Sequence, residues 1–255
     1  MIEKWGTPVP KITGKAPRTI YVYVPDGAKE DPEARFPVLY MFDGHNVFFD
    51  KDATYGKSWG MKDYMDETET PVIVVGIDCN HRPKNGRLSE YSPWSFQDSH
   101  FGFVQGRGHL FMDWLVNTLK PMIDERYPTI PDREATWIAG SSMGGLMTLY
   151  AVTAYNQVFS KAAALSPSVW VAPKKLNRLI RETELAPGTT IYMDYGAREF
   201  ANHEGMRHLF MLTSNELMNK DVSLTARVVP NGDHCEACWE EQVPFFMNIL
   251  LYERE

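Results

Sequence analysis

The sequence predicts an α/β fold in which a mostly parallel central sheet carries helices on both faces. Several apolar runs are continuous rather than alternating, which is typical of strands that are covered on both sides. These runs alternate along the chain with segments whose apolar residues recur at helical spacing. Hydrophobic residues make up 44% of the 255 residues, which is enough to build a sizeable core. Because no repeat or linker divides the chain, we expect a single domain over residues 1–255.

The order of the expected elements supports this fold class. β-Branched and aromatic residues predict early strands at residues 19–25, 36–42 and 71–77. Later strands are expected at residues 135–139, 162–166, 189–195 and 223–229, and helices at residues 110–127, 146–155, 205–220 and 239–252. The connection from Asn80 to His109 is expected to be a loop, and a loop of this length inside a compact domain is usually functional.

Charge and hydropathy argue against two classes of partner. The formal net charge is −7 and no run of Lys or Arg stands out, so we expect no nucleic-acid binding, which needs a concentrated positive face. No window approaches 18 apolar residues, so we expect no membrane span. The N-terminal residues lack the apolar stretch of a signal peptide, and we expect a cytoplasmic protein, or a secreted one if a leader has been removed. No feature indicates an oligomeric state.

The strongest functional signal is the segment Gly140-Ser141-Ser142-Met143-Gly144, which fits Gly-x-Ser-x-Gly between an expected strand and an expected helix. Such a turn lifts the serine hydroxyl clear of the sheet, and the N-terminus of the following helix favours developing negative charge. Side chains two positions either side of the serine would collide with the sheet and the helix, which explains the glycines. The pattern therefore predicts Ser142 as a nucleophile.

A serine hydroxyl is a weak nucleophile and needs a base, and on this type of turn the partners follow in the order Ser, then Asp or Glu, then His. His234 lies after the last expected strand and before the last helix, so we predict it as the general base. The acid should follow the strand that ends near Tyr195. Glu199 lies beyond the turn and can reach back, and we favour it over Asp194, which is still within the strand pattern. Its role would be to orient the histidine and stabilise the imidazolium.

Further segments match a known family: Leu39-Tyr40-Met41-Phe42-Asp43-Gly44-His45-Asn46-Val47-Phe48, Gly76-Ile77-Asp78, Arg87 with Glu90-Tyr91-Ser92-Pro93, Leu119-Lys120-Pro121, Gly140 to Gly145, Leu165-Ser166-Pro167-Ser168, Tyr195-Gly196-Ala197-Arg198-Glu199, and His234 followed by Trp239. Over about residues 19–251 the chain thus resembles the esterase D family of α/β-hydrolases, which includes feruloyl, acetyl xylan and enterochelin-type esterases. The usual signature of S-formylglutathione hydrolases, which are distant members, is not present around the histidine.

The resemblance implies an α/β-hydrolase fold and a serine esterase that needs no cofactor and no metal. The backbone N–H groups of His45 and Met143 would form the oxyanion hole. His234 would take the proton of Ser142, which attacks the ester carbonyl, and water would release the acyl group. The implied substrate is a small-molecule or oligosaccharide ester, with an acetyl or feruloyl group on carbohydrate.

Two other functions stay open. One is a siderophore esterase of the enterochelin type, for which we expect a more basic pocket than a chain of net charge −7 obviously offers. The other is a catalytically silent binding protein on the same fold, since a fold does not fix a function. That alternative predicts a missing member of the triad, whereas a candidate for each is present.

Aromatic and cysteine residues near the expected site need separate interpretation. Six aromatic residues fall on or near loops above the sheet and could stack on a sugar or an aromatic acyl group: Tyr55, Trp59, Tyr91, Trp94, Phe101 and Trp170. Of these we predict Trp59, Tyr91 and Trp170 as substrate-binding residues. Cys235 and Cys238 follow the histidine directly, and we favour small buried residues over a redox pair or a metal site. We expect Asp78, Arg87 and Glu90 to form structural ion pairs that hold the long loop.

Overall fold

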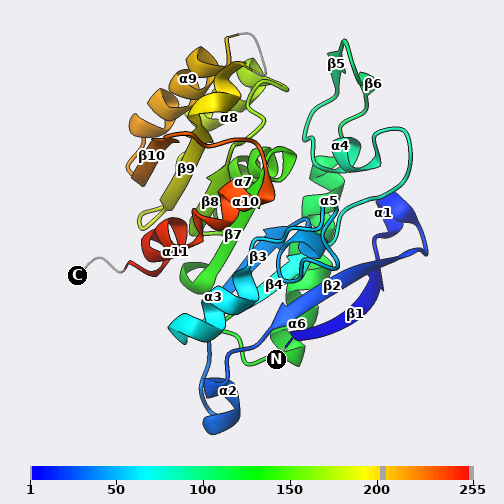
Figure 1. Cartoon of the computed structure of the whole chain (residues 1–255), viewed down its shortest axis with the longest axis vertical. Coiled ribbons are helices and arrows are strands. Elements are labelled where there is room, and N and C mark those ends of the chain that lie inside the picture. Colours follow the sequence, from blue (N-terminus) through cyan, green and yellow to red (C-terminus); the bar gives the residue numbers. More distant parts are fainter. Residues whose placement is uncertain (1, 202–204, 253–255) are drawn as a thin grey trace.

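The computed structural model describes residues 2–201 and 205–252, and its centre is one eight-stranded sheet in the order β1-β2-β4-β3-β7-β8-β9-β10 (Figure 1). The strands are β1 (Ile2–Pro8), β2 (Pro17–Tyr23), β3 (Val38–Phe42), β4 (Ile73–Ile77), β7 (Thr136–Ser141), β8 (Lys161–Leu165), β9 (Thr190–Gly196) and β10 (Ser223–Val229). All neighbours from β4 to β10 run parallel, and the two pairings at the other edge, β1 with β2 and β2 with β4, are antiparallel. The prediction of a mostly parallel sheet is confirmed.

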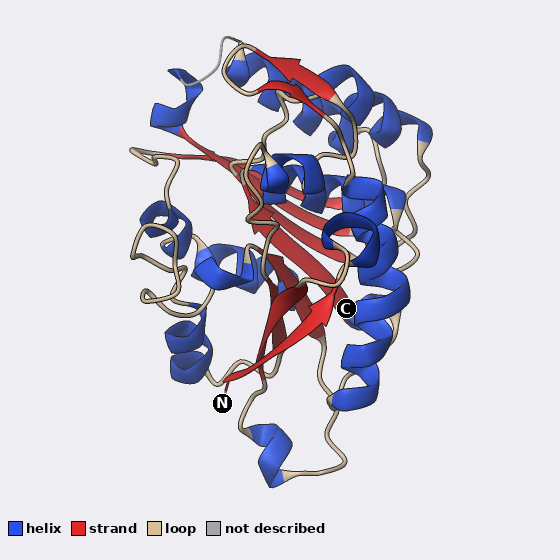
Figure 2. Cartoon of the chain, turned by 90° about the vertical axis from the view of Figure 1, so that its right-hand side faces the viewer, coloured by secondary structure: helices blue, strands red, loops and turns tan. Residues whose placement is uncertain are grey.

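Helices cover both faces of this sheet, as Figure 2 shows. One face carries α5 (Gly108–Trp114), α6 (Lys120–Arg126), α7 (Met143–Ala154), α8 (Pro173–Glu182) and α9 (Met206–Met218). The other face carries α3 (Met61–Thr68), α10 (Glu236–Glu240) and α11 (Val243–Leu251). Short helices α1 (Pro10–Thr13), α2 (Gly27–Glu30) and α4 (Gly86–Glu90) and the turns η1 (Gly44–Asn46), η3 (Arg133–Ala135) and η4 (Ala197–Ala201) complete the connections.

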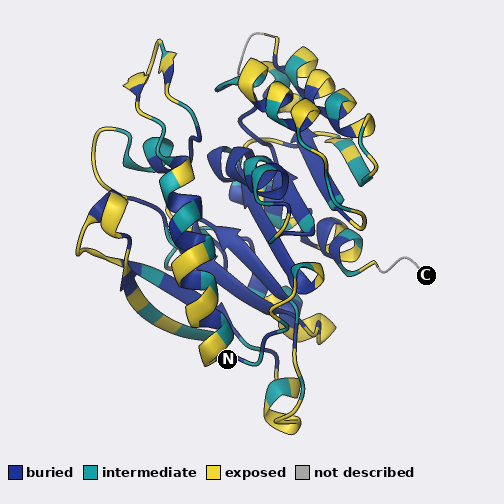
Figure 3. Cartoon of the chain, turned by 180° about the vertical axis from the view of Figure 1, so that it is seen from behind, coloured by how far each residue is buried: buried dark blue, intermediate teal, exposed yellow. Residues whose placement is uncertain are grey.

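The continuous apolar runs arise because each central strand feeds two separate cores. Along β3, Val38, Tyr40 and Phe42 point into the core beneath α5–α9. The alternate residues Leu39 and Met41 point into the core beneath α3 and α11. Side chains of a strand alternate between its faces, so a strand buried on both sides has no polar position left. Figure 3 shows the consequence, a fully buried centre whose covering helices expose only their outer faces.

Two predicted helices are interrupted at prolines. The helix expected over residues 110–127 runs as α5, a π-helical stretch η2 (Leu115–Leu119) and α6, with Pro121 in the first turn of α6. The helix expected over residues 239–252 divides into α10 and α11, with Pro244 in the first turn of α11. Proline has no N–H to donate to the preceding turn, so the helical ladder changes pitch or restarts there. Among the described residues, no helix is long and apolar enough to span a membrane.

Several elements of the fold are not predicted by the sequence patterns. The edge strand β1 pairs along its whole length with β2, and α8 packs Leu176 and Ile180 into the core. The segment from Asn80 to His109 is not a plain loop, because it contains α4 and a hairpin of β5 (Phe96–Asp98) and β6 (Gly102–Val104). This segment rises above the carboxyl ends of β4, β3 and β7, where it borders the site (Figure 1).

Candidate active site

Ser142 occupies the sharp turn between β7 and α7, with φ 58° and ψ −121°. This conformation is strained for a residue with a side chain, and it persists because the turn is held from both sides. The Ser142 N–H donates to the Leu165 carbonyl at 2.9 Å, and the Ser142 carbonyl accepts from the Ser168 N–H at 2.9 Å. A Cβ at Gly140 would lie 2.9 Å from the Gly144 backbone and from the Phe42 ring, so glycine is required there.

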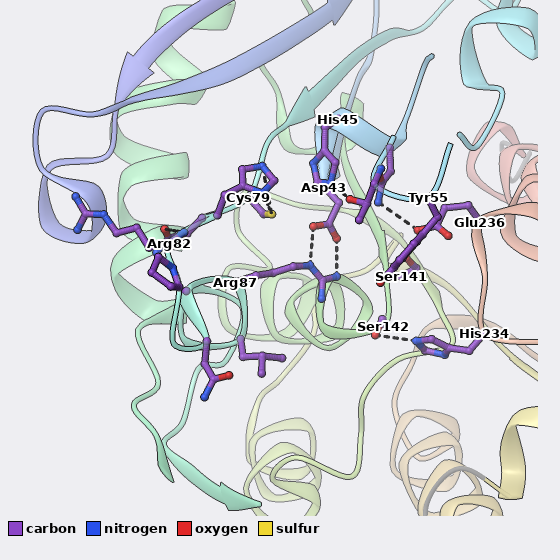
Figure 4. A pocket seen from close by; sticks show the side chains of 18 of the residues that line it. Asp43, His45, Tyr55, Cys79, Arg82, Arg87, Ser141, Ser142, His234 and Glu236 are labelled. Atoms are coloured by element: carbon purple, nitrogen blue, oxygen red, sulfur yellow. Dashed lines mark hydrogen bonds and ion pairs between the residues drawn. The ribbon is translucent and has the colours of Figure 1, made fainter. Parts of the chain in front are cut away.

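The structure brings Ser142, His234 and Glu199 together from three strand ends (Figure 4 shows the first two). His234 Nε2 lies 2.9 Å from Ser142 Oγ, and His234 Nδ1 lies 2.5 Å from Glu199 Oε2. The serine follows β7, the glutamate lies in η4 after β9, and the histidine lies in the loop after β10. Because these strands are parallel neighbours or near neighbours, their carboxyl ends meet at one edge of the sheet.

Glu199 is almost completely buried and its second oxygen is also bound. Oε1 accepts hydrogen bonds from Ser166 Oγ at 2.7 Å and from the Gly196 N–H at 2.9 Å. Ser166 Oγ in turn accepts from Trp239 Nε1 at 3.0 Å, and the Trp239 ring meets the His234 ring edge-on at 5.0 Å. Two residues that sequence reasoning gave no role, Ser166 and Trp239, therefore hold the acid and the imidazole in place.

Asp194, the alternative acid, lies behind Ser166 and does not form a hydrogen bond with the imidazole. Its carboxylate accepts from the Tyr192 hydroxyl at 2.7 Å and from the Ser166 N–H at 3.2 Å. Burial raises the pKa of Asp194 to about 6 despite these hydrogen bonds. The imidazole is bound by Glu199 instead, which is the residue that the sequence favoured.

The turn η1 places His45 opposite the serine. It begins at Asp43, which has a left-handed φ of 55° and accepts a bidentate pair of hydrogen bonds from Arg87, both at 2.7 Å. The Tyr91 hydroxyl accepts from the Asp43 N–H at 3.1 Å. Met143, the other expected donor of the oxyanion hole, is the first residue of α7. Arg87 therefore forms the structural ion pair that was expected of it.

Two of the three predicted substrate-binding residues are not at the surface, which corrects that expectation. Trp59 is 3% exposed and packs against Trp239 and Phe246 in the core beneath α11. Tyr91 is fully buried, and its hydroxyl holds the Asp43 turn rather than facing solvent. Both residues are large aromatics that the folded chain uses for packing. Trp170 does line the cleft beside Ser142.

The cleft has two parts that meet at Ser142 and His234. A cavity of about 580 Å³ is bordered on one side by the polar wall, by which we mean Asp43, His45, His81, Arg82 and Arg87. A smaller cavity of about 250 Å³ is bordered by the aromatic pocket, by which we mean Phe101, Trp170 and Tyr195. Both lie at the carboxyl ends of the strands, where α/β sheets bind ligands.

The two cysteines beside the histidine are free thiols. Cys235 caps the N-terminus of α10, and Cys238 Sγ accepts a hydrogen bond from the Asp233 N–H at 3.2 Å. Both are half-buried, so they form part of the support of the His234 loop.

Three curated relatives share sequence with this chain. The Bacillus subtilis protein YbbA is 26% identical over 201 residues, covering 77% of this chain and 75% of that protein. The siderophore triacetylfusarinine C esterase of Aspergillus fumigatus is 36% identical over 149 residues, covering 56% of this chain and 47% of that enzyme. The ferri-bacillibactin esterase BesA of Bacillus subtilis is 24% identical over 182 residues, covering 66% of this chain and 61% of that enzyme. The match to the Aspergillus enzyme thus spans about half of its length.

Solved structures share the fold. An IroE-like serine hydrolase from Shewanella oneidensis superposes with a TM-score of 0.74 at 17% identity, over 98% of this chain and 78% of that one. A ferulic acid esterase superposes with a TM-score of 0.69 at 16% identity, over 98% of each chain. The sequence model of the family described as "Putative esterase" matches residues 13–245. Because this match covers most of its length, the chain belongs to that esterase family.

Proposed function

We propose that the chain is a serine carboxyl-ester hydrolase of the esterase D type, formed as one catalytic domain. Ser142 is the nucleophile, His234 the general base, and Glu199 the acid that orients the base. One observation carries the proposal: a continuous line of polar contacts runs from Ser142 Oγ through both imidazole nitrogens to a buried carboxylate, at 2.9 and 2.5 Å. Nucleophile, base and orienting group are within the distances that this chemistry requires.

In the proposed reaction His234 Nε2 accepts the proton of Ser142 Oγ as that oxygen attacks the ester carbonyl. The tetrahedral intermediate collapses when the imidazolium gives its proton to the leaving alcohol, which leaves an acyl group on the serine. A water molecule, deprotonated by the same imidazole, then releases the acid. Glu199 stabilises the imidazolium at both stages, because its carboxylate contacts Nδ1.

The oxyanion hole is proposed from the backbone N–H groups of Met143 and His45. Met143 follows the serine at the N-terminus of α7, where unpaired N–H groups and the helix dipole favour negative charge. His45 contributes from η1, a turn whose start is held by the Asp43–Arg87 pair. Its role is therefore independent of the chemistry of its imidazole.

For the substrate, we propose an ester of the siderophore class, oxygen-rich and carrying several acyl bonds. Two curated relatives are named as esterases of such compounds, and the larger cavity is of the size that holds a ligand of several hundred daltons. The net charge of −7 does not describe this cavity, because Arg82, Lys84 and three histidines line it, and the charge of Asp43 is balanced by its ion pair with Arg87. Local charge, rather than net charge, sets the attraction of an anionic chelate.

Carbohydrate acyl esters are the second candidate, favoured by the aromatic pocket. Phe101, Trp170 and the edge of Tyr195 border a cavity of about 250 Å³ next to Ser142. A planar feruloyl group can stack on such side chains, whereas an acetyl group has no ring with which to stack.

The test is an ester panel on wild type and Ser142→Ala: p-nitrophenyl acetate, methyl ferulate, acetylated xylo-oligosaccharide, ferri-bacillibactin and triacetylfusarinine C. We expect the highest kcat/KM on a siderophore ester and loss of every activity in the variant. Preference for methyl ferulate would assign the second candidate. A wild type that is silent on all five, or a variant that keeps near-normal rates, would contradict the proposed chemistry.

A surface substitution tests the charge argument separately. Lys84 lines the larger cavity and takes no part in the triad. Lys84→Gln should raise the KM for the anionic ferri-bacillibactin about 2- to 5-fold, the effect of a surface charge worth up to about 1 kcal/mol. The neutral p-nitrophenyl acetate is the control and should be unaffected. An equal change on both substrates would show that the charge of Lys84 does not select the substrate.

A further inference from the structure

A second group of chemically reactive side chains lies partly within and partly behind the polar wall, away from the triad. His45, Asp78, Cys79 and His81 each offer one ligand atom, and these four atoms all lie within 4.8 Å of one another. Asp78 Oδ1 is the centre of the group, 2.6 Å from His45 Nδ1 and 2.8 Å from His81 Nε2. Cys79 Sγ lies 3.9 Å from the His81 ring nitrogens. The group combines residues of η1 with the segment that follows β4.

The contact between His45 and Asp78 is unusual for ordinary hydrogen bonding. Among the described residues, no partner forms a hydrogen bond of acceptable geometry with the buried His45 Nδ1, although Asp78 Oδ1 is 2.6 Å away. The other ring nitrogen, Nε2, contacts the Thr54 hydroxyl at 2.9 Å. In the tautomer in which Nε2 carries the ring proton and donates it to Thr54, Nδ1 presents a lone pair that the carboxylate oxygen repels at this distance, and a cation bound to both atoms removes the repulsion.

The set of donors indicates which cation. Two imidazoles, one carboxylate and one thiol are ligands of Zn²⁺ and its neighbours in the first transition row, whereas Mg²⁺ and Ca²⁺ take oxygen ligands. Four donors match the tetrahedral coordination that zinc prefers.

The site is exposed to solvent mainly at His81, between the larger cavity and a second cavity that Asp78, Cys79 and His81 also line. Cys79 and His45 are buried, Asp78 is 14% exposed, and the His81 side chain is 60% exposed. His45, Cys79 and His81 also line the cavity of about 580 Å³ that reaches Ser142. An ion can therefore enter from the cleft and meet His81 first.

We propose that His45, Asp78, Cys79 and His81 bind one divalent transition-metal ion of the zinc class. On binding, the Cys79 thiol releases its proton to solvent, and both imidazoles coordinate as neutral rings. The ion fixes the η1 turn through the His45 side chain, next to the backbone N–H assigned above to the oxyanion hole. The proposal goes beyond ester hydrolysis, and metal binding can be measured on the protein whether or not it hydrolyses an ester.

The first experiment titrates the metal-stripped full chain with Co²⁺ and follows absorption, then repeats the titration with Zn²⁺ in a calorimeter. We expect one ion per chain and, with Co²⁺, a thiolate-to-metal charge-transfer band in the near ultraviolet. Zinc at a free concentration of about 100 times Kd should raise the melting temperature by roughly 5 °C or more.

Matched substitutions identify the ligands. Cys79→Ser should abolish the cobalt charge-transfer band, whereas Cys238→Ser, which removes a thiol beside His234, should keep it. Because Cys79 is buried and its substitution can disturb folding, the exposed ligand is tested as well. His81→Asn should weaken binding at least about 10- to 100-fold, and His100→Asn, at an exposed histidine of the β5–β6 hairpin, should leave it unchanged.

The outcomes separate the proposal from its rivals. No stoichiometric binding to the wild type would overturn it. So would a cobalt band that survives in Cys79→Ser and disappears in Cys238→Ser, because the ion would then lie at the Cys235–Cys238 pair. A wild type that binds metal but hydrolyses no ester would keep the metal site and reject the serine esterase.

Discussion

The two sides of Ser142 are built in different ways. On the side of β9 and β10, Glu199 and His234 lie directly after parallel strands, and Glu199 receives hydrogen bonds from a backbone N–H and a buried serine. On the side of β3 and β4, the polar wall depends on ion pairs such as Asp43–Arg87, contributed partly by the long segment between β4 and α5. The sheet fixes the groups assigned to chemistry, while side chains of a connecting segment form the surface assigned to recognition. Substitutions on the first side should therefore affect turnover, and those on the second should affect binding or stability.

The largest effect is expected from the triad. Ser142→Ala and His234→Ala should each lower kcat by at least about 10,000-fold, because the nucleophile and its base act as one unit. For the same reason the double variant should be no worse than either single variant. Kinetics on one p-nitrophenyl ester measure all three, with Ser141→Ala as the matched control. Losses that multiply in the double variant would show that the two residues act independently.

The two buried carboxylates near the base should differ strongly. Glu199→Gln should lower kcat by about 1,000- to 10,000-fold, since the amide cannot stabilise the imidazolium and can favour the wrong tautomer. Asp194→Asn should lower it less than about 10-fold, because Asp194 bonds to Tyr192 and the Ser166 backbone instead. Equal losses in both variants would contradict the assignment of the acid.

On the other side of the cleft, a buried ion pair should control stability. Arg18 and Glu90 are almost fully buried and form two hydrogen bonds, at 2.6 and 2.8 Å, that join β2 to α4. Arg18→Met leaves the carboxylate buried without its partner and should reduce the free energy of unfolding by about 3–5 kcal/mol. Denaturant unfolding measures this. The double variant Arg18→Met/Glu90→Leu should recover much of the loss, and failure to recover would assign the loss to packing.

Asp194 also predicts a pH dependence of stability. Burial raises its pKa to about 6 in the folded protein, above the value of about 3.9 in an unfolded chain. Between these values the folded state holds a proton that the unfolded state has lost, so this group makes the protein less stable as pH rises from about 4 to about 6. The contribution is up to about 3 kcal/mol. Melting curves at several pH values should show a steeper fall in wild type than in Asp194→Asn, and parallel curves would contradict the prediction.

The smallest effect is expected in the aromatic pocket. Trp170→Ala should raise KM for methyl ferulate about 5- to 10-fold, as a ring contact worth about 1–1.5 kcal/mol is lost. The KM for p-nitrophenyl acetate is the internal control for folding. It should change less than 2-fold, which corresponds to a difference in binding free energy of less than about 0.4 kcal/mol. A uniform change on both esters would mean that Trp170 supports the cleft without contacting the acyl group.

The parts of the site that follow strand ends could be read from the sequence. The turn at Ser142 has a local signature, chain order selected His234, and the position of Glu199 beyond the turn favoured it over Asp194, in agreement with the contacts in the fold. The mostly parallel sheet was predicted from its apolar runs and is confirmed. These features depend on short-range sequence patterns and on the order in which the serine, the acid and the histidine follow one another along the chain.

The rest of the site depends on burial and on contacts between distant segments. Trp59 and Tyr91 were expected at the surface because they lie near loops, but only the packed fold shows that both are buried. The ligand group was missed because His45 and Asp78 are 33 positions apart, and their contact follows from the turn η1 lying beside the end of β4. Neither secondary-structure propensity nor the spacing of motifs predicts such a contact between distant segments.

Active-site labelling is the most direct test of whether Ser142 is a nucleophile activated by His234. The wild type is treated with a fluorophosphonate, digested, and the adduct is mapped by mass spectrometry, with His234→Ala as the comparison. We expect one adduct on Ser142 in the wild type and slow or absent labelling in the variant. An adduct on the neighbouring Ser141, equal labelling of both proteins, or no adduct on the wild type would contradict it.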